Sequence, residues 1–132
     1  METNERKRFM SKDNDVAGHR KRVKERFLKT GFDSWQDYEI LELILFYVIP
    51  RKDTKQTAKN LIKEFGSLKE LMNADHDKLL DVLKDIDGAG PNTAFFFRFL
   101  KEISVKYSEF KMKDKKKLSS PQEAVEFLKN RI

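Results

Sequence analysis

Two glycines separated by a single residue, Gly88 and Gly90, are the feature that most constrains how this chain can fold. Apolar residues recur at helical spacing over residues 79–86 before them and over residues 94–110 after them. Because glycine adopts positive φ without steric cost, the Gly-x-Gly sequence predicts a tight turn between two helices. The free N–H groups at the start of the second helix, with the positive end of its dipole, would suit a phosphate oxygen.

This turn allows two interpretations. It can be the turn of a helix-hairpin-helix that binds the DNA backbone, or a connector whose glycines only permit close packing of two helices. The residues of the turn alone do not favour either interpretation. On the first one, the candidate DNA-binding residues of the hairpin are Gly88, Ala89, Gly90, Asn92 and Thr93.

The remainder of the chain shows the same helical periodicity, with no run at the period of two that indicates a strand. Further helices are expected over residues 18–30, 35–48 and 54–65, with a short helix after residue 67. The segment 35–48 is apolar on nearly every side, which is typical of a central, buried helix. The predicted fold class is therefore all-α: a compact bundle of five or six helices that contains the helix-hairpin-helix, followed by a basic linker and a C-terminal helix.

Capping signals mark the expected helix ends. The predicted caps are Gly31 and Gly66 as C-caps, Asp33 or Ser34 as the N-cap before residue 35, Asp53 and Asp75 as further N-caps, and Ser67 with Glu70 as a capping box. The sixth helix is expected to begin near Pro91 or Asn92, since proline is tolerated in a first helical turn.

Composition divides the chain into four segments. Residues 1–16 are polar without apolar periodicity, which predicts a flexible basic tail. Residues 17–110 form the predicted helical domain. Residues 111–117 are rich in lysine and are predicted to be a linker. Residues 118–132 carry a further helix-start signal, and we expect them to begin another domain.

Three adjacent phenylalanines, residues 95–97, and Phe99 shortly after them lie in the expected sixth helix. They cannot all share one face of a helix, so the helix should be covered by its neighbours. Burial in the core is the favoured interpretation. The alternative is an exposed surface for a partner.

Positive charge is concentrated in blocks within a net charge of +6. Localised positive charge favours a nucleic acid or an acidic protein as partner, although solubility alone also produces charged helix faces. Glu39 and Glu42 are expected to pair with nearby basic residues and not to act as catalytic acids. The candidate phosphate-contacting residues are Arg20, Arg22 and Arg26 in the first expected helix, and Arg51, Lys52, Lys55, Lys59 and Lys63 in and before the third.

Several function classes are disfavoured. The absence of cysteine excludes disulfides, zinc-thiolate sites and thiol catalysis. The longest apolar run, residues 43–49, is far shorter than the roughly 20 residues of a membrane span, and no apolar signal segment is visible. We therefore expect a cytoplasmic chain with no cofactor, no metal and no membrane partner.

Three stretches of the sequence together resemble one family. Residues 18–27 read Gly-His-Arg-x-Arg-Val-x-x-Arg-Phe, and residues 38–55 read Tyr-Glu-Ile-Leu-Glu-Leu-Ile-Leu-Phe-Tyr-Val-Ile-Pro-Arg-Lys-Asp-Thr-Lys. The third stretch combines Phe-Gly-Ser-Leu at residues 65–68, the Gly-Ala-Gly turn, and Leu-Ser-Ser-Pro at residues 118–121. Over residues 18–132 the chain resembles the N-terminal part of the bacterial RadC proteins, a family that carries a DNA-repair label.

The resemblance implies an N-terminal domain of helix-hairpin-helix type, followed by a JAB/MPN-type metalloprotease-like domain with a His-x-His motif and a zinc-bound water. No His-x-His motif occurs in this sequence, so we expect the chain to lack that domain and its protease activity. The hairpin also departs from the usual pattern. Ala89 is small, Asn92 stands where a lysine is frequent, Asp87 adds a negative charge, and Pro91 removes a donor.

Two functional hypotheses follow. The first is a non-enzymatic, sequence-independent DNA-binding domain that contacts phosphates through the hairpin amides and the basic helix faces. The second is a protein-interaction or regulatory module, whose partner is the JAB/MPN-like domain or another protein. The apolar residues 95–99 and the final expected helix motivate the second. No nucleophile–base arrangement or metal-ligand spacing supports an enzyme in this chain.

Overall fold

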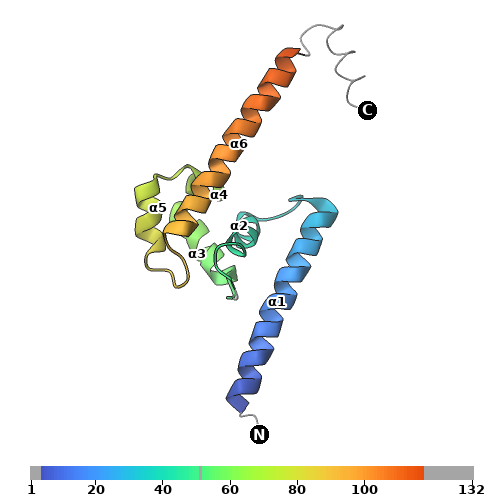
Figure 1. Cartoon of the computed structure of the whole chain (residues 1–132), viewed down its shortest axis with the longest axis vertical. Coiled ribbons are helices and arrows are strands. Elements are labelled where there is room, and N and C mark those ends of the chain that lie inside the picture. The colour runs from blue at the N-terminus through green and yellow to red at the C-terminus, as the bar shows by residue number, and fades with distance from the viewer. Residues whose placement is uncertain (1–3, 51, 118–132) are drawn as a thin grey trace. The chain divides into compact units, whose positions relative to one another are not determined.

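The computed structural model describes the backbone of residues 4–50 and 52–117, and the side chains of residues 15–50 and 52–115. Within those ranges all regular secondary structure is helical, so the predicted all-α fold class is confirmed (Figure 1). The helices are α1 (Asn4–Thr30), α2 (Asp37–Leu45), α3 (Lys55–Phe65), α4 (Leu68–Asn73), α5 (His76–Leu83) and α6 (Pro91–Lys117).

The chain divides into two units, residues 1–97 and residues 98–132. The first unit holds α1 to α5 and the start of α6. The second unit, as far as it is described, is the remainder of α6. The C-terminal helix and the further domain predicted for residues 118–132 lie outside the described residues, as does Arg51.

Several predicted helix ends are confirmed by their capping geometry. Gly31 and Gly66 end α1 and α3 with φ of 63° and 97°, a conformation that glycine adopts more readily than any other residue. At the start of α4, the Ser67 hydroxyl accepts the N–H of Glu70 at 3.1 Å. These ends are determined by short-range hydrogen bonds, which is why the local sequence predicts them.

The start of α2 differs from the prediction. Ser34 has a φ of 64°, so it lies in the left-handed region and not in the extended conformation of an N-cap. The predicted capping by Asp33 or Ser34 is therefore wrong, and Gln36 is the N-cap of a helix that begins at Asp37. Its backbone N–H donates to Oε1 of Glu39 at 3.0 Å, which satisfies a donor at the start of the helix.

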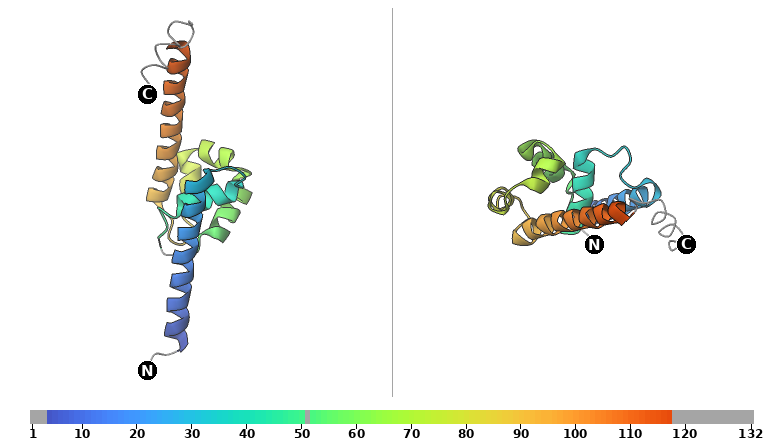
Figure 2. Two further views of the ribbon diagram at one scale, coloured as in Figure 1. Left: turned by 90° about the vertical axis from the view of Figure 1, so that its right-hand side faces the viewer. Right: turned by 90° about the horizontal axis from the view of Figure 1, so that it is seen from above.

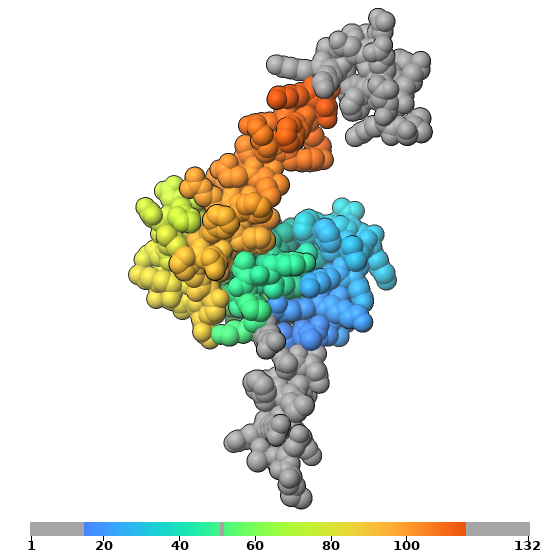
Figure 3. Space-filling view, in the orientation of Figure 1, coloured from blue at the N-terminus to red at the C-terminus, as the bar shows by residue number. Residues whose placement is uncertain are grey.

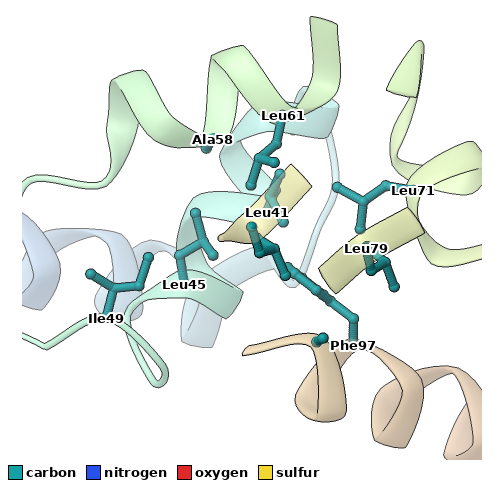
Figure 4. Packing of buried hydrophobic residues seen from close by; sticks show 10 residues of the cluster. Leu41, Leu45, Ile49, Ala58, Leu61, Leu71, Leu79 and Phe97 are labelled. Carbon is teal, nitrogen blue, oxygen red and sulfur yellow. The ribbon is translucent and has the colours of Figure 1, made fainter. Parts of the chain in front are cut away.

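The first unit packs around α2, as predicted. Leu41 and Leu45 are completely buried and lie at the centre of the core in Figure 4. Each of the other helices from α3 onward contributes to this cluster, so residues from four different segments bury the same helix. The other buried members are Ile49, Ala58, Leu61, Leu71, Leu79, Leu83, Ala94 and Phe97.

A second, smaller cluster attaches α1 to α2. Trp35 and Phe46 are buried beside Leu43, and Val23 and Phe27 of α1 pack against them. The two views of Figure 2 agree that the C-terminal part of α1 runs beside α2. This apolar contact fixes which face of α1 remains available for its basic residues.

Two segments that composition set apart from the helical domain, the predicted tail and the predicted linker, are helical. α1 begins at Asn4, so residues 4–16 of the predicted flexible tail belong to a helix. α6 likewise continues through residues 111–117, the predicted linker. Neither segment contains glycine or proline, and lysine is a good helix former. A high density of charge therefore did not indicate a break in the backbone.

The phenylalanine segment divides between core and surface. Phe97 is 1% exposed and belongs to the main cluster, whereas Phe95 is 63% exposed and Phe99 is 48% exposed. Burial in the core is thus confirmed for Phe97 and wrong for Phe95 and Phe99. Residues two apart on a helix face in different directions, so only part of such a run can meet one core.

Candidate nucleic-acid interface

The Gly-x-Gly turn between α5 and α6 packs against the segment that follows α2. Gly88 has a φ of 85°, and a Cβ atom at this position would lie 3.1 Å from Cγ2 of Ile49 and 3.5 Å from Nζ of Lys52. Glycine is needed here both for the positive φ and for the close approach. The connector interpretation of the turn therefore has direct structural support.

The first amides of the turn already have acceptors within the turn. The Gly88 N–H interacts with the carboxylate of Asp87, and the Ala89 N–H donates to the Ile86 carbonyl at 3.1 Å. A phosphate oxygen would have to displace these partners to use the same donors.

The amides at the start of α6 show the same pattern. The Gly90 N–H donates to Oγ1 of Thr93 at 3.3 Å, and the Thr93 N–H donates back to the Gly90 carbonyl at 3.0 Å. Pro91 has no N–H. Of the five predicted hairpin residues, Asn92 is the one whose amide has no acceptor among the described contacts.

Asp87 brings a negative charge to the turn and pairs with Lys52. The Lys52 ammonium donates to the Asp87 carboxylate and joins the turn to the segment after α2. This hydrogen bond and the attraction of the same ammonium hold the pKa of Asp87 below its usual range, with a smaller contribution from the Gly88 N–H. The predicted phosphate contact Lys52 is thus already paired with a carboxylate.

Arg20, another predicted phosphate contact, binds backbone carbonyls instead. Its guanidinium donates to the carbonyl oxygens of Phe46 at 2.8 Å, Ile49 at 2.6 Å and Lys52 at 2.7 Å, and it lies 4.7 Å from the Phe46 ring centroid. Burial lowers the pKa of Arg20, although the carboxylate of Glu42 opposes that shift. Arg20 therefore holds α1 to the end of α2.

The two glutamates of α2 pair with α1, as the sequence predicted. Arg26 donates to Oε2 of Glu39 at 2.5 Å and its guanidinium lies 4.5 Å from the Trp35 ring centroid. Nε2 of His19 lies 2.6 Å from Oε1 of the buried Glu42. The pKa of Glu39 is lowered, first by the hydrogen bond from the Gln36 backbone and then by Arg26.

Four of the predicted cations remain available to a ligand. The side chains of Arg22, Lys55, Lys59 and Lys63 are exposed, and no carboxylate among the described residues forms an ion pair with them. The three lysines are spaced by four residues on α3 and extend along about 12 Å of its axis. Lys59 also lies 5.0 Å over the Tyr38 ring.

A cavity of about 310 Å³ joins these two cationic helices. Residues of α1 form one wall, and Phe46 with residues 52–55 forms the other. Figure 3 shows the atoms of α1, in blue, side by side with the green segment that follows α2. The basic side chains of the lining are Arg20, Arg22, Lys52 and Lys55, and the acidic ones are Asp15 and Asp53.

One residue of this cavity was not identified from the sequence. Thr54 lines the cavity and is 2% exposed, and its hydroxyl has no hydrogen-bond partner among the described residues. A threonine just before a helix carries no sequence signal for such a role, because its burial depends on how distant segments of the first unit pack together.

The described part of the chain offers no group of three or more His, Cys, Asp or Glu side chains that could hold a metal ion. None of its helices combines the length and the apolar character that a membrane crossing requires.

No protein-family model matches the chain, and no solved structure matches it significantly. Among curated proteins, the chain is similar to the UPF0758 protein FN0909 of Fusobacterium nucleatum subsp. nucleatum, with 42% identity over 128 residues. The alignment covers 91% of this chain and 53% of that relative, so the chain spans about half of the relative's length. UPF0758 is the curated designation of the RadC family. That name states no activity, ligand or partner.

Proposed function

We propose that the chain is the N-terminal region of a RadC-type protein and that it binds DNA through backbone phosphates, without base specificity and without catalysis of its own. The resemblance of residues 18–132 and the similarity to the UPF0758 protein support the family. The distribution of paired and unpaired cations on the first unit supports the mode of binding.

The observation that carries this proposal is the set of exposed, unpaired cations on two helices that share a cavity. Arg22 on α1 and Lys55, Lys59 and Lys63 on α3 are exposed and form no ion pair with a carboxylate among the described residues. Such charges release counterions when they meet phosphates, which is the main source of sequence-independent affinity for DNA. Arginine and lysine are also the side chains that most often contact phosphate oxygens.

The hairpin has an architectural part in this proposal. Gly88 allows the turn to approach Ile49, and the Lys52–Asp87 pair holds it there. The hairpin thereby supports the segment before α3, where the row of lysines begins. Its amides are a secondary contact at most, because four of the five predicted ones already have acceptors inside the turn.

Fluorescence anisotropy with a labelled duplex, a single strand and a fork of unrelated sequences, measured across a salt series, tests the proposal. Four neutralised phosphates predict a slope of about −3.6 for log affinity against log salt on B-DNA. The affinities for unrelated duplexes should agree within about twofold, since no base is read. The absence of saturable binding at low salt would refute the proposal.

A second candidate function, a protein-interaction module, has its own support in the second unit. Along α6 the side chains of Phe99, Ile103, Tyr107 and Phe110 are about half exposed and recur at intervals of three and four residues. This spacing places them on one helix face. An exposed apolar face of this kind is typical of a contact with another protein surface, such as the JAB/MPN-like domain of a longer RadC protein.

Sedimentation velocity of wild type and two variants tests this second function. Ile103→Ser removes an apolar side chain from the face, and Val105→Ser removes a similar one from a different face of the same helix. Association that weakens in Ile103→Ser and persists in Val105→Ser supports the module. A chain that stays monomeric at all concentrations and does not bind the separate JAB/MPN-like domain would rule it out.

A further inference from the structure

We propose that the cavity between α1 and residues 52–55 is a binding site for a single phosphate group, carried either by a DNA strand or by a small phosphorylated molecule. The inference rests on the proposed function for the source of that phosphate. The site itself stands on its own geometry and is tested separately with inorganic phosphate.

The charge of the cavity wall favours an anion. Arg22 and Lys55 reach it from opposite sides, and neither has a carboxylate partner among the described residues. Of the two acidic residues in the lining, Asp53 uses Oδ1 to accept the N–H of Lys55 at 3.0 Å. The N-cap of α3 is Thr54, so the prediction of Asp53 as that N-cap is wrong. One cation from each of two helices, on either side of the cavity, can bind the oxygens of the same phosphate group.

The hydroxyl of Thr54 is an independent sign of a ligand. Thr54 is 98% buried and lines the cavity, and its Oγ1 atom has no hydrogen-bond partner in the described structure. Nearly all buried polar side chains in folded proteins have a hydrogen-bond partner. The unpaired hydroxyl of Thr54 therefore suggests that a bound ligand supplies the partner. Oγ1 is covered in the structure, so a small movement of the lining would let this hydroxyl donate a hydrogen bond to a phosphate oxygen in the cavity.

Arg20 adds to the same environment. Its Nη atoms are occupied by three carbonyls, but its buried Nε has no partner among the described residues. The residue therefore keeps a positive charge at the cavity wall while it holds α1 in place. The cavity volume of about 310 Å³ is at the lower end of the range for small-molecule sites, which leaves room for a phosphate ester.

The test is a titration of the full chain with inorganic phosphate, followed by two-dimensional NMR, with chloride at matched ionic strength as reference. Wild type should show saturable, phosphate-specific shifts at residues that line the cavity. Lys55→Gln and Arg22→Gln should each weaken this binding about tenfold, because each removes a charged hydrogen-bond donor. Thr54→Val should weaken it about fivefold while it keeps the shape of the side chain.

Matched controls come from the same helix. Lys63→Gln removes an equal charge from the far end of α3, and Thr57→Val makes the same chemical change at a residue outside the lining. Both should bind phosphate within about twofold of wild type. Shifts that do not saturate, or a loss in Lys63→Gln equal to that in Lys55→Gln, would overturn the proposal.

Two further titrations separate this inference from the proposed function. A duplex oligonucleotide that shifts the same cavity resonances identifies a DNA phosphate as the occupant, and a mononucleotide that does so when DNA does not identifies a small ligand. Phosphate binding without DNA binding would keep the site and refute the DNA-binding function. DNA binding without a phosphate-specific response in the cavity would keep the DNA-binding function and refute the phosphate site.

Discussion

Nη2 of Arg20 donates to the carbonyl oxygen of Ile49 at 2.6 Å, across 29 positions of sequence. The same guanidinium also holds the carbonyls of Phe46 and Lys52. A planar guanidinium can bond several acceptors at once, and here it satisfies carbonyls of the irregular segment that follows α2. Arg20, which the sequence predicted as a phosphate contact, thus attaches α1 to the segment after α2 within the first unit.

Arg20→Lys should destabilise the protein by about 1.5–3 kcal/mol, since one ammonium cannot replace three directed hydrogen bonds to carbonyls. Urea unfolding measures this. The matched change Arg22→Lys, on the same helix but at an exposed side chain that forms no ion pair with another described residue, should stay within about 0.5 kcal/mol of wild type. Equal stabilities for the two variants would contradict the role of Arg20.

Gly88→Ala should cost more stability than Gly31→Ala. Both glycines have positive φ, so either substitution introduces backbone strain of about 1–2 kcal/mol. At position 88 the new Cβ would also meet Ile49 at 3.1 Å, whereas at position 31 it meets nothing within 4 Å. Thermal unfolding of the two variants separates strain from close packing, and a larger loss in Gly31→Ala would refute the close packing.

The features that the sequence predicted well are those decided by neighbouring residues. The Ser67–Glu70 cap and the two glycine C-caps depend on contacts within a few positions, and α2 is apolar enough to be recognised as central. The pairing of Glu39 and Glu42 with basic residues was also predicted, because these two acids lie in an otherwise apolar segment of a chain in which basic residues outnumber acidic ones.

What the sequence could not determine is which cations are already occupied. Arg20 and Lys55 look alike in a list of charges, yet the guanidinium of Arg20 binds three carbonyls and the ammonium of Lys55 forms no ion pair among the described residues. That difference depends on the packing of α1 against α2, which no local pattern encodes. The helical character of residues 111–117 was missed for another reason, since composition was taken as a sign of backbone conformation.

Phe97→Ala should lose about 3–5 kcal/mol of stability, because it removes a buried aromatic ring from the main cluster. Phe95→Ala, two positions earlier and mostly exposed, should lose less than about 1 kcal/mol. Denaturant unfolding of both variants gives the comparison. Similar losses would mean that the two rings do not divide between core and surface as described.

The stability of the protein should fall in acid partly through Glu39. Its pKa is lowered in the folded state, so the unfolded state takes up the proton more readily. This contribution to stability is complete above the usual titration range of glutamate, near pH 4.3, and is lost as the pH falls through the lowered pKa.

Glu39→Gln should therefore lose less stability than wild type between roughly pH 6 and pH 3, measured by urea unfolding at each pH. Glu102→Gln, at an exposed position of α6, is the matched control and should follow the wild-type profile. A Glu39→Gln profile as steep as that of wild type would show that the carboxylate has no such role.

The most direct test of the central claim compares two triple variants in duplex DNA binding across a salt series. Lys55, Lys59 and Lys63 change to Gln in one, and the exposed residues Lys29, Lys69 and Lys113 change to Gln in the other, so both lose the same charge. We predict that the α3 variant loses about 2.7 units of the log–log salt slope, while the control keeps a slope close to that of wild type. Equal slopes in the two variants would contradict the assignment of α3 as the phosphate-contacting surface.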